Sequence, residues 1–148
     1  MLSKKAKYAI NSLVRLAKEY DKGPILIDSI AKAEHIPKKF LEVILLDLRN
    51  AGILGSRRGP GGGYYLLRKP KDVNMAEVIR LFDGPIALLP CVTYKYYERC
   101  EECRDEEICG IRSVIQEVRN ETVKILKANT LADILKRERK LLDQKKNA

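Results

Sequence analysis

The sequence predicts a mainly α-helical fold with one small β-hairpin, made of a helical unit and a separate long helix. Three observations support this prediction. Apolar residues recur at helical spacing through the first fifty residues, a glycine-rich segment between short apolar runs follows, and a narrow apolar stripe repeats from Ile108 to Ile125. A chain of 148 residues, of which 45% are apolar, is long enough to form one domain with an appendage.

The first predicted helix begins near Ser3, a suitable N-cap, and ends before Gly23-Pro24. Its apolar positions share one face because they recur three or four residues apart. These positions are Ala6, Ala9, Ile10, Leu13, Ala17 and Tyr20.

Two short helices joined by a tight turn are predicted next. Asp28 can cap a helix that ends near Glu34, and Pro37 suits the first position of the following helix, which ends at Ala51-Gly52. Two short helices behind a longer supporting helix have the outline of a helix-turn-helix unit. The second of them is expected to bury Phe40, Leu41, Ile44, Leu45 and Leu48.

A β-hairpin directly after this unit predicts a winged helix-turn-helix domain over residues 1–84. Ile53-Leu54 and the run YYLL from residue 64 are the expected strands, and SRRGPGGG is the tip between them. A helix from Asn74 to Gly84-Pro85 completes the domain, with Glu77 placed to form a capping box.

Self-association is expected through the long helix within residues 108–136, which also contain a terminal helix that Thr130 and Asp133 can cap. The earlier helices already have a core to pack against, so a second copy of the chain is the expected partner, and packing within one chain is the alternative. Residues 137–148 form a charged tail that we expect to be solvated or frayed. The residues of the long helix that recur alternately three and four positions apart, as in a coiled coil, form one apolar seam: Ile108, Ile111, Ile115, Val118, Thr122 and Ile125.

The net charge of +9 favours a polyanionic partner such as nucleic acid. In a helix-turn-helix, the exposed N-terminal residues of the second helix face the bases, which selects Lys38, Lys39 and Glu42. Lysine can reach guanine or phosphate, and glutamate can accept a hydrogen bond from cytosine N4.

The wing places Arg57 and Arg58 beside a tip with almost no side-chain bulk, which includes Gly59 and Gly61. Such a tip can enter a minor groove or contact a phosphate. A glycine-rich loop also suggests nucleotide binding, but SRRGPGGGYY has neither the P-loop ending nor the dinucleotide-binding spacing.

All four cysteines lie in the expected sensor segment, residues 85–109, with the spacing C-x8-C-x2-C-x5-C. Zinc sites favour two close pairs, whereas here only Cys100 and Cys103 are close, and the single histidine, His35, is distant. Four thiolates can hold an iron–sulfur cluster, which is the first expectation, with zinc and thiol–disulfide switching as alternatives. The surrounding acidic residues disfavour contact with DNA: Glu98, Glu101, Glu102, Asp105, Glu106 and Glu107.

Lysine or arginine interrupts every apolar run of the first eighteen residues, so they contain neither a signal-peptide core nor a membrane span. We therefore expect a cytoplasmic protein, in which disulfides are rare. An enzyme is not expected, because there is no acid–base pair with histidine, no P-loop and no nucleophile motif.

Four segments together resemble the bacterial winged-helix transcription regulators of the IscR/NsrR type, the Rrf2 family: KYAINSLVRLA, FLEVILLDLRNAGIL, SRRGPGGGYYL and TLADIL. The stretch RGPGGGY is the most specific of them. The resemblance implies a homodimer in which each winged helix contacts half of a palindromic operator. It also implies that Lys39, Phe40 and Glu42 lie in the contacting region and that Arg58 points at the minor groove.

For the cluster, the resemblance implies that Cys91, Cys103 and Cys109 are ligands. Some relatives use a histidine three residues past the last cysteine, where this chain has Arg112. Others use an acidic residue near the N-terminus, where Lys7 and Tyr8 stand here.

Cys100 is then the replacement for the fourth ligand, and [2Fe–2S] is expected before [4Fe–4S]. These inferences together predict a DNA-binding transcription regulator, a repressor, whose operator binding an iron–sulfur cluster modulates. One alternative is a winged-helix regulator that senses thiol redox state or a protein partner without metal. The other is a zinc-binding interaction or adaptor protein.

Overall fold

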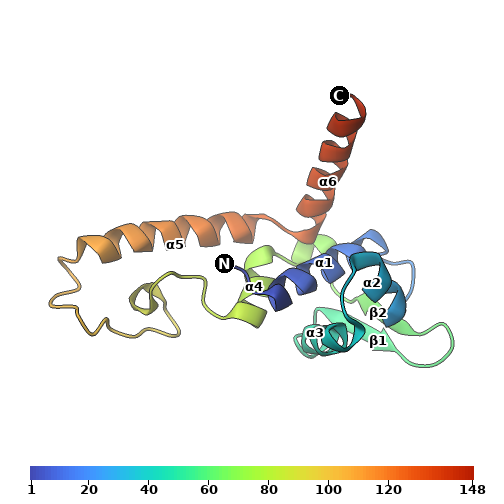
Figure 1. Ribbon diagram of the computed structural model, residues 1–148, viewed down its shortest axis with the longest axis horizontal. Helices are drawn as coiled ribbons and strands as arrows, with labels where there is room; N and C mark the ends of the chain where they lie inside the picture. The colour runs from blue at the N-terminus through green and yellow to red at the C-terminus, as the bar shows by residue number, and fades with distance from the viewer.

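Six helices and one β-hairpin make up the fold of the computed structural model, which describes residues 1–148. The helices α1 to α4 and the hairpin form one packed unit, from which α5 and α6 project in different directions (Figure 1). This arrangement confirms the predicted fold class. The elements are α1 (Lys4–Lys18), α2 (Ile27–Glu34), α3 (Lys38–Asn50), β1 (Leu54–Arg57), β2 (Gly63–Leu66), the short 3-10 helix η1 (Pro70–Asp72), α4 (Met75–Asp83), the 3-10 helix η2 (Pro90–Val92), α5 (Gly110–Ala128) and α6 (Leu131–Lys146).

Helix α1 lies at the centre of the packed unit, in contact with α2, α3, α4, α6 and β2. It begins as predicted, because the Ser3 hydroxyl accepts a hydrogen bond from the Ala6 N–H at 3.0 Å. It ends at Lys18, before the expected Gly23-Pro24, and a turn occupies the residues between them. The core around α1 includes Leu13, Leu16, Ile30, Leu41, Ile44, Leu45, Leu48, Ile53, Leu54 and Val78.

The two helices of the helix-turn-helix, α2 and α3, both begin differently from the prediction. Asp28 does not cap α2, because the N-cap is Leu26 and Asp28 already lies in the first helical turn. Its carboxylate instead pairs with the Lys38 ammonium at 2.9 Å. Pro37 is the N-cap of α3 rather than its first helical residue. The sharp turn between α2 and α3 comes from His35, whose left-handed backbone (φ 53°) ends α2.

The wing is attached to the connection between α1 and α2. Ile25 and Tyr64 exchange two backbone hydrogen bonds of 2.7 and 2.8 Å, which form an isolated β-bridge beside β2. Gly63 sits at the closest point, with φ at 139°, and a Cβ there would lie 2.2 Å from the Ile25 carbonyl oxygen. Only glycine fits this approach. Arg57 pairs with Gly63 as the last residue of β1, which leaves residues 58–62 as the tip.

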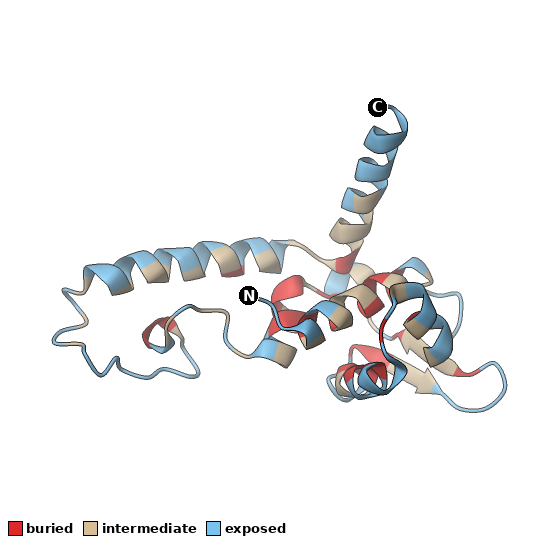
Figure 2. Ribbon diagram, viewed as in Figure 1, coloured by how far each residue is buried: buried red, intermediate tan, exposed pale blue.

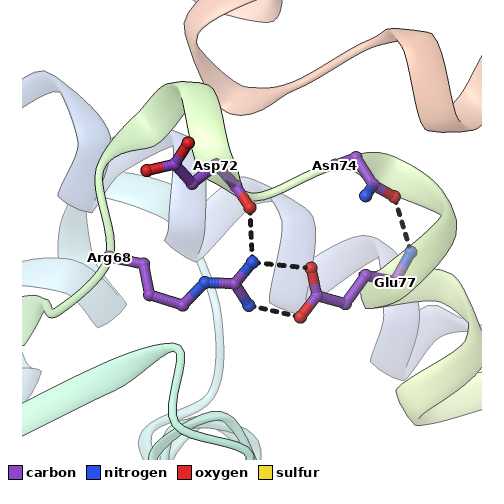
Figure 3. A network of polar contacts seen from close by, with 4 residues as sticks. All are labelled: Arg68, Asp72, Asn74 and Glu77. Atoms are coloured by element: carbon purple, nitrogen blue, oxygen red, sulfur yellow. Dashed lines mark hydrogen bonds and ion pairs between the residues drawn. The ribbon is translucent and has the colours of Figure 1, made fainter.

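The expected capping box at α4 forms only in part (Figure 3). The Asn74 side-chain oxygen accepts from the Glu77 N–H at 3.0 Å, but the Glu77 carboxylate does not return to Asn74. Arg68 donates to both oxygens of Glu77 and to the Asp72 carbonyl. The hydrogen bond to Glu77 is the main cause that raises the pKa of Arg68. This network joins the end of the wing to the start of α4.

Helix α6 begins with the predicted capping box between Thr130 and Asp133. It then continues to Lys146, so the tail expected to fray from residue 137 is helical, although almost all of it is exposed (Figure 2). Glu138 pairs with Lys18 of α1 at 2.8 Å, and Lys145 and Lys146 complement the helix dipole in the last turn. No helix of this fold has the length and apolar character needed to cross a membrane.

Replacing Gly63 with alanine is predicted to detach the wing from the α1–α2 connection. The added Cβ meets backbone atoms that cannot move aside, so we expect Gly63→Ala to lower the free energy of unfolding by about 3 kcal/mol. Gly61→Ala is the matched control, because Gly61 also has a positive φ but no atom within 4 Å of its Cβ position, and it should cost about 1 kcal/mol. Urea unfolding measures both values, and equal losses would contradict the role of Gly63.

Candidate DNA-binding surface and cysteine segment

The N-terminal part of α3 presents an exposed face that contains the predicted contact residues. Lys39 and Glu42 are exposed, and Lys38 is exposed but paired with Asp28. The hydrogen bond that the Lys38 ammonium donates to Asp28 is the main cause that raises the pKa of Lys38, so this side chain stays charged. The expected burial of Phe40 is wrong: its side chain is 42% exposed and packs edge-on against the Tyr8 ring, with the ring centroids 5.6 Å apart.

Two further residues of this face were missed by the sequence analysis. Val43 and Leu46 are 52% and 45% exposed, although both are large apolar side chains. They lie four and seven residues after Lys39 and therefore share its face, opposite the buried face of α3. The sequence did contain a signal for them, because α3 has apolar residues on two opposite faces. Only one of these faces can pack against the core, so the other must be exposed.

The wing carries two exposed arginines, one at the end of β1 and one in the tip. Arg57 and Arg58 are exposed, and Gly59 and Gly61 follow with φ values of 87° and 72°. β1 contacts α3, and Figure 1 shows both elements at the end of the molecule opposite α6. The exposed face of α3 and the wing therefore belong to the same side of the packed unit.

The two outer cysteines are both held near the start of α5. Cys91 lies in η2 and is 5% exposed, and η2 packs against α5. Cys109 is the N-cap of α5, where its sulfur accepts from the Arg112 N–H at 3.4 Å. The Arg112 side chain donates back to the Cys91 carbonyl, also at 3.4 Å. Arg112 thus links the beginning and the end of the cysteine segment.

The two middle cysteines, Cys100 and Cys103, are more exposed to solvent than Cys91. Cys100 is exposed and Cys103 is partly exposed, and a turn closed by a 3.1 Å hydrogen bond from the Cys103 N–H to the Cys100 carbonyl connects them. The Cys100 thiol donates to the Glu102 carboxylate at 2.9 Å. This bond is the main cause that raises the pKa of Cys100 and lowers that of Glu102.

The four thiols match an iron–sulfur cluster in the kind of donor they supply. Their positions in the fold are less favourable, because no three histidine, cysteine or acidic side chains come together as a metal-holding group. Cys91 points into the packed region, whereas Cys100 lies at the surface. The part between η2 and α5 has no helix or strand, so the middle cysteines can approach the outer two without breaking a regular element.

The predicted seam of α5 is not covered within the chain. Ile108, Ile111 and Ile125 are 81%, 72% and 59% exposed, and Ile115 and Thr122 are only partly buried. Val123, on another side of the helix, is the one buried residue of α5. Most of the seam is therefore exposed in the single chain, which favours a second copy over packing inside one chain as its partner.

Comparison with known proteins identifies the regulators that this chain is similar to. Residues 2–137 match the model of the Rrf2 family, described as iron-dependent transcriptional regulators. An Rrf2-like HTH-type transcriptional regulator of Rhodobacter capsulatus is 44% identical over 138 residues, which are 91% of this chain and 92% of the relative.

Solved structures agree with this result. CymR, the global cysteine regulator of Bacillus subtilis, superposes with a TM-score of 0.75 at 29% identity, covering 90% of this chain and 95% of CymR. IscR of T. potens also has a TM-score of 0.75, at 28% identity, covering 93% and 88%. These relatives are transcription regulators and not enzymes, as expected from the sequence. The chain belongs to the Rrf2 family of HTH-type, DNA-binding transcription regulators.

Proposed function

We propose that this protein is a cytoplasmic, homodimeric repressor that binds a palindromic operator and responds to an iron–sulfur cluster held in the cysteine segment. The main support is the position of all four thiols. They lie in one stretch of nineteen residues that begins in η2, packed on α5, and ends at the N-cap of α5. A change in this stretch therefore acts directly on the helix whose apolar seam is exposed.

DNA contact is proposed through the α3 face and the wing. Lys39 is placed for guanine or phosphate, Glu42 for cytosine N4, and Val43 and Leu46 for thymine methyl groups. Lys38 contacts phosphate beside them. Phe40 holds the start of α3 through its contact with Tyr8.

The wing contributes phosphate and minor-groove contacts. Arg58 enters the minor groove, and Arg57 at the end of β1 contacts the backbone. The positive φ of Gly59 and Gly61 allows the tip to turn tightly without side chains that would collide with the groove.

Homodimer formation is proposed through α5. At 19 residues this helix is about 28 Å long, and its seam side chains lie along one face. Two copies related by a two-fold axis would bury these faces against each other and present two α3 helices to the two halves of a palindrome. The domain limits proposed are residues 1–84 for DNA binding, 85–109 for sensing, 108–136 for dimerisation and 137–148 for the charged end.

The cluster ligands proposed are Cys91, Cys100, Cys103 and Cys109, and [2Fe–2S] is favoured over [4Fe–4S]. When bound, the cluster would supply an oxidant-sensitive crosslink between η2 and α5. The chain's own contribution is Arg112, which already connects these two ends through Cys91 and Cys109. A regulator needs contacts that differ between two states, and the ordering of residues 91–109 against α5 provides them.

A second candidate is thiol switching without metal. The observation that favours it is the turn at Cys100 and Cys103, which brings two cysteines of C-x2-C spacing together in a stretch that forms no metal-holding group. A disulfide there would also change the segment before α5. One structural neighbour, CymR, is described as a cysteine regulator.

Arg58→Ala is predicted to weaken DNA binding about tenfold and to reduce the salt slope of binding by about 1, because one phosphate or groove contact is lost. Arg139→Ala on the exposed part of α6 is the control and should leave both values unchanged. Fluorescence anisotropy with promoter fragments at several salt concentrations measures them. An unchanged affinity for Arg58→Ala would contradict the wing assignment.

Ile111→Glu combined with Ile125→Glu is predicted to convert the dimer to a monomer. Both side chains are exposed within one chain, so the substitutions spare the monomer core but place charges in the proposed interface. Ser113→Glu adds the same charge on the opposite face of α5 and should remain dimeric. Sedimentation velocity distinguishes the 16.9 kDa chain from a species of twice that mass. A monomeric unsubstituted protein would rule out the proposed dimer.

Protein purified without oxygen is predicted to contain stoichiometric iron and sulfide and to absorb visible light. Cys100→Ser should lose this iron, whereas His35→Gln, which lies in the turn between α2 and α3, should keep it. Elemental analysis and absorption spectra provide the measurement. Colourless protein with stoichiometric zinc would contradict the cluster and indicate a zinc site instead. Metal-free protein whose DNA affinity changes reversibly with dithiothreitol would support the thiol switch.

A further inference from the structure

A cavity of about 490 Å³ lies where the DNA-binding unit meets the cysteine segment and α5. Its walls come from parts of the chain that are far apart in sequence. Ala51 is the C-cap of α3, Arg80 is on α4, Tyr94 and Tyr96 follow η2, and Arg119 is on α5. The cavity has the size of a small-molecule site.

Three positive charges line this cavity without acidic partners. Arg80, Lys95 and Arg119 take part in none of the ion pairs of the structure. Glu77 is the one acidic residue of the lining, and Arg68 already occupies both of its oxygens. The net charge available to a bound molecule is therefore positive.

The two tyrosines supply flat walls beside these cations. The Arg119 guanidinium lies 4.3 Å from the centroid of the Tyr94 ring, and the Lys95 ammonium lies 5.6 Å from that of Tyr96. The guanidinium of Arg119 donates one hydrogen bond, to the Asn120 side-chain oxygen at 3.0 Å, and so keeps donors for another acceptor. Apolar side chains, among them Leu81 and Ile86, complete the lining.

We propose that this cavity binds a small aromatic anion, with its acidic oxygens on Arg80, Lys95 and Arg119 and its ring against the tyrosines. The site is additional to the proposed cluster and needs neither metal nor DNA. Its position gives the ligand a regulatory role, because Ala51 is the C-cap of α3 and Tyr94 lies three residues after Cys91. A bound molecule would connect the DNA-binding unit to the sensor segment and favour one arrangement of the two.

The test uses the full chain labelled with 3-fluorotyrosine, because its seven tyrosines give few 19F resonances. Tyr94→Phe and Tyr96→Phe assign the two resonances of the cavity. Phenyl phosphate and benzoate are titrated at constant ionic strength, with benzamide as the neutral ring and inorganic phosphate as the anion without a ring. We expect saturable shifts of both resonances with the two aromatic anions and at least about tenfold weaker binding of the other two probes.

Arg119→Gln should weaken binding of phenyl phosphate about tenfold or more, because a charge-assisted contact is lost. Arg139→Gln, which removes the same charge from α6 far from the cavity, should not weaken it. Arg80→Gln and Lys95→Gln serve as further variants if thermal unfolding shows that Arg119→Gln is unstable. Equal binding of benzamide, shifts confined to other tyrosines, or full affinity in all three variants would overturn the proposal.

Discussion

The burial of α1 against four helices and β2 is the interaction on which the other features of this protein depend. Leu13 and Leu16 are almost fully buried, and α3 packs its own inner face against the same core. Because that inner face is fixed, the opposite face of α3 with Lys39 and Glu42 must point to solvent. Ser3 strengthens the arrangement, since its backbone N–H donates at 2.9 Å to Asp83 at the end of α4.

Helix α5 contrasts with α1 because it contributes so little to that core. Val123 is its one buried residue, and its contacts within the chain are with α4 and η2. Full burial of an isoleucine side chain stabilises an association by about 1.5–3 kcal/mol, so the exposed seam favours a second copy strongly. The helix proposed to pair two copies is thus also the helix whose N-cap, Cys109, belongs to the cysteine segment. In the proposed dimer, a local change at Cys109 would therefore alter the distance between the two DNA-binding units.

Much of the fold could be predicted because its signals are local. Ser3 and Thr130 cap their helices as expected, and the glycine-rich hairpin follows α3 as expected. The predictions that were wrong concern polar side chains that could bind more than one partner. Asp28 pairs with Lys38 rather than capping α2, and Glu77 pairs with Arg68 rather than closing its capping box. The charged end of the chain is helical because α6 is extended from a well-formed first turn.

The sequence by itself determined the types and order of the elements, the family, the cationic wing and the grouping of four thiols in one segment. These features depend on hydrophobic periodicity and on residues close together in the chain. Only the tertiary structure decided that Val43 and Leu46 face solvent and that the α5 seam lacks a partner within the chain. It also decided that residues between 51 and 119 line one cavity that is open to solvent. Such outcomes depend on how separate elements pack, because exposure and side-chain partners are set by neighbours distant in sequence.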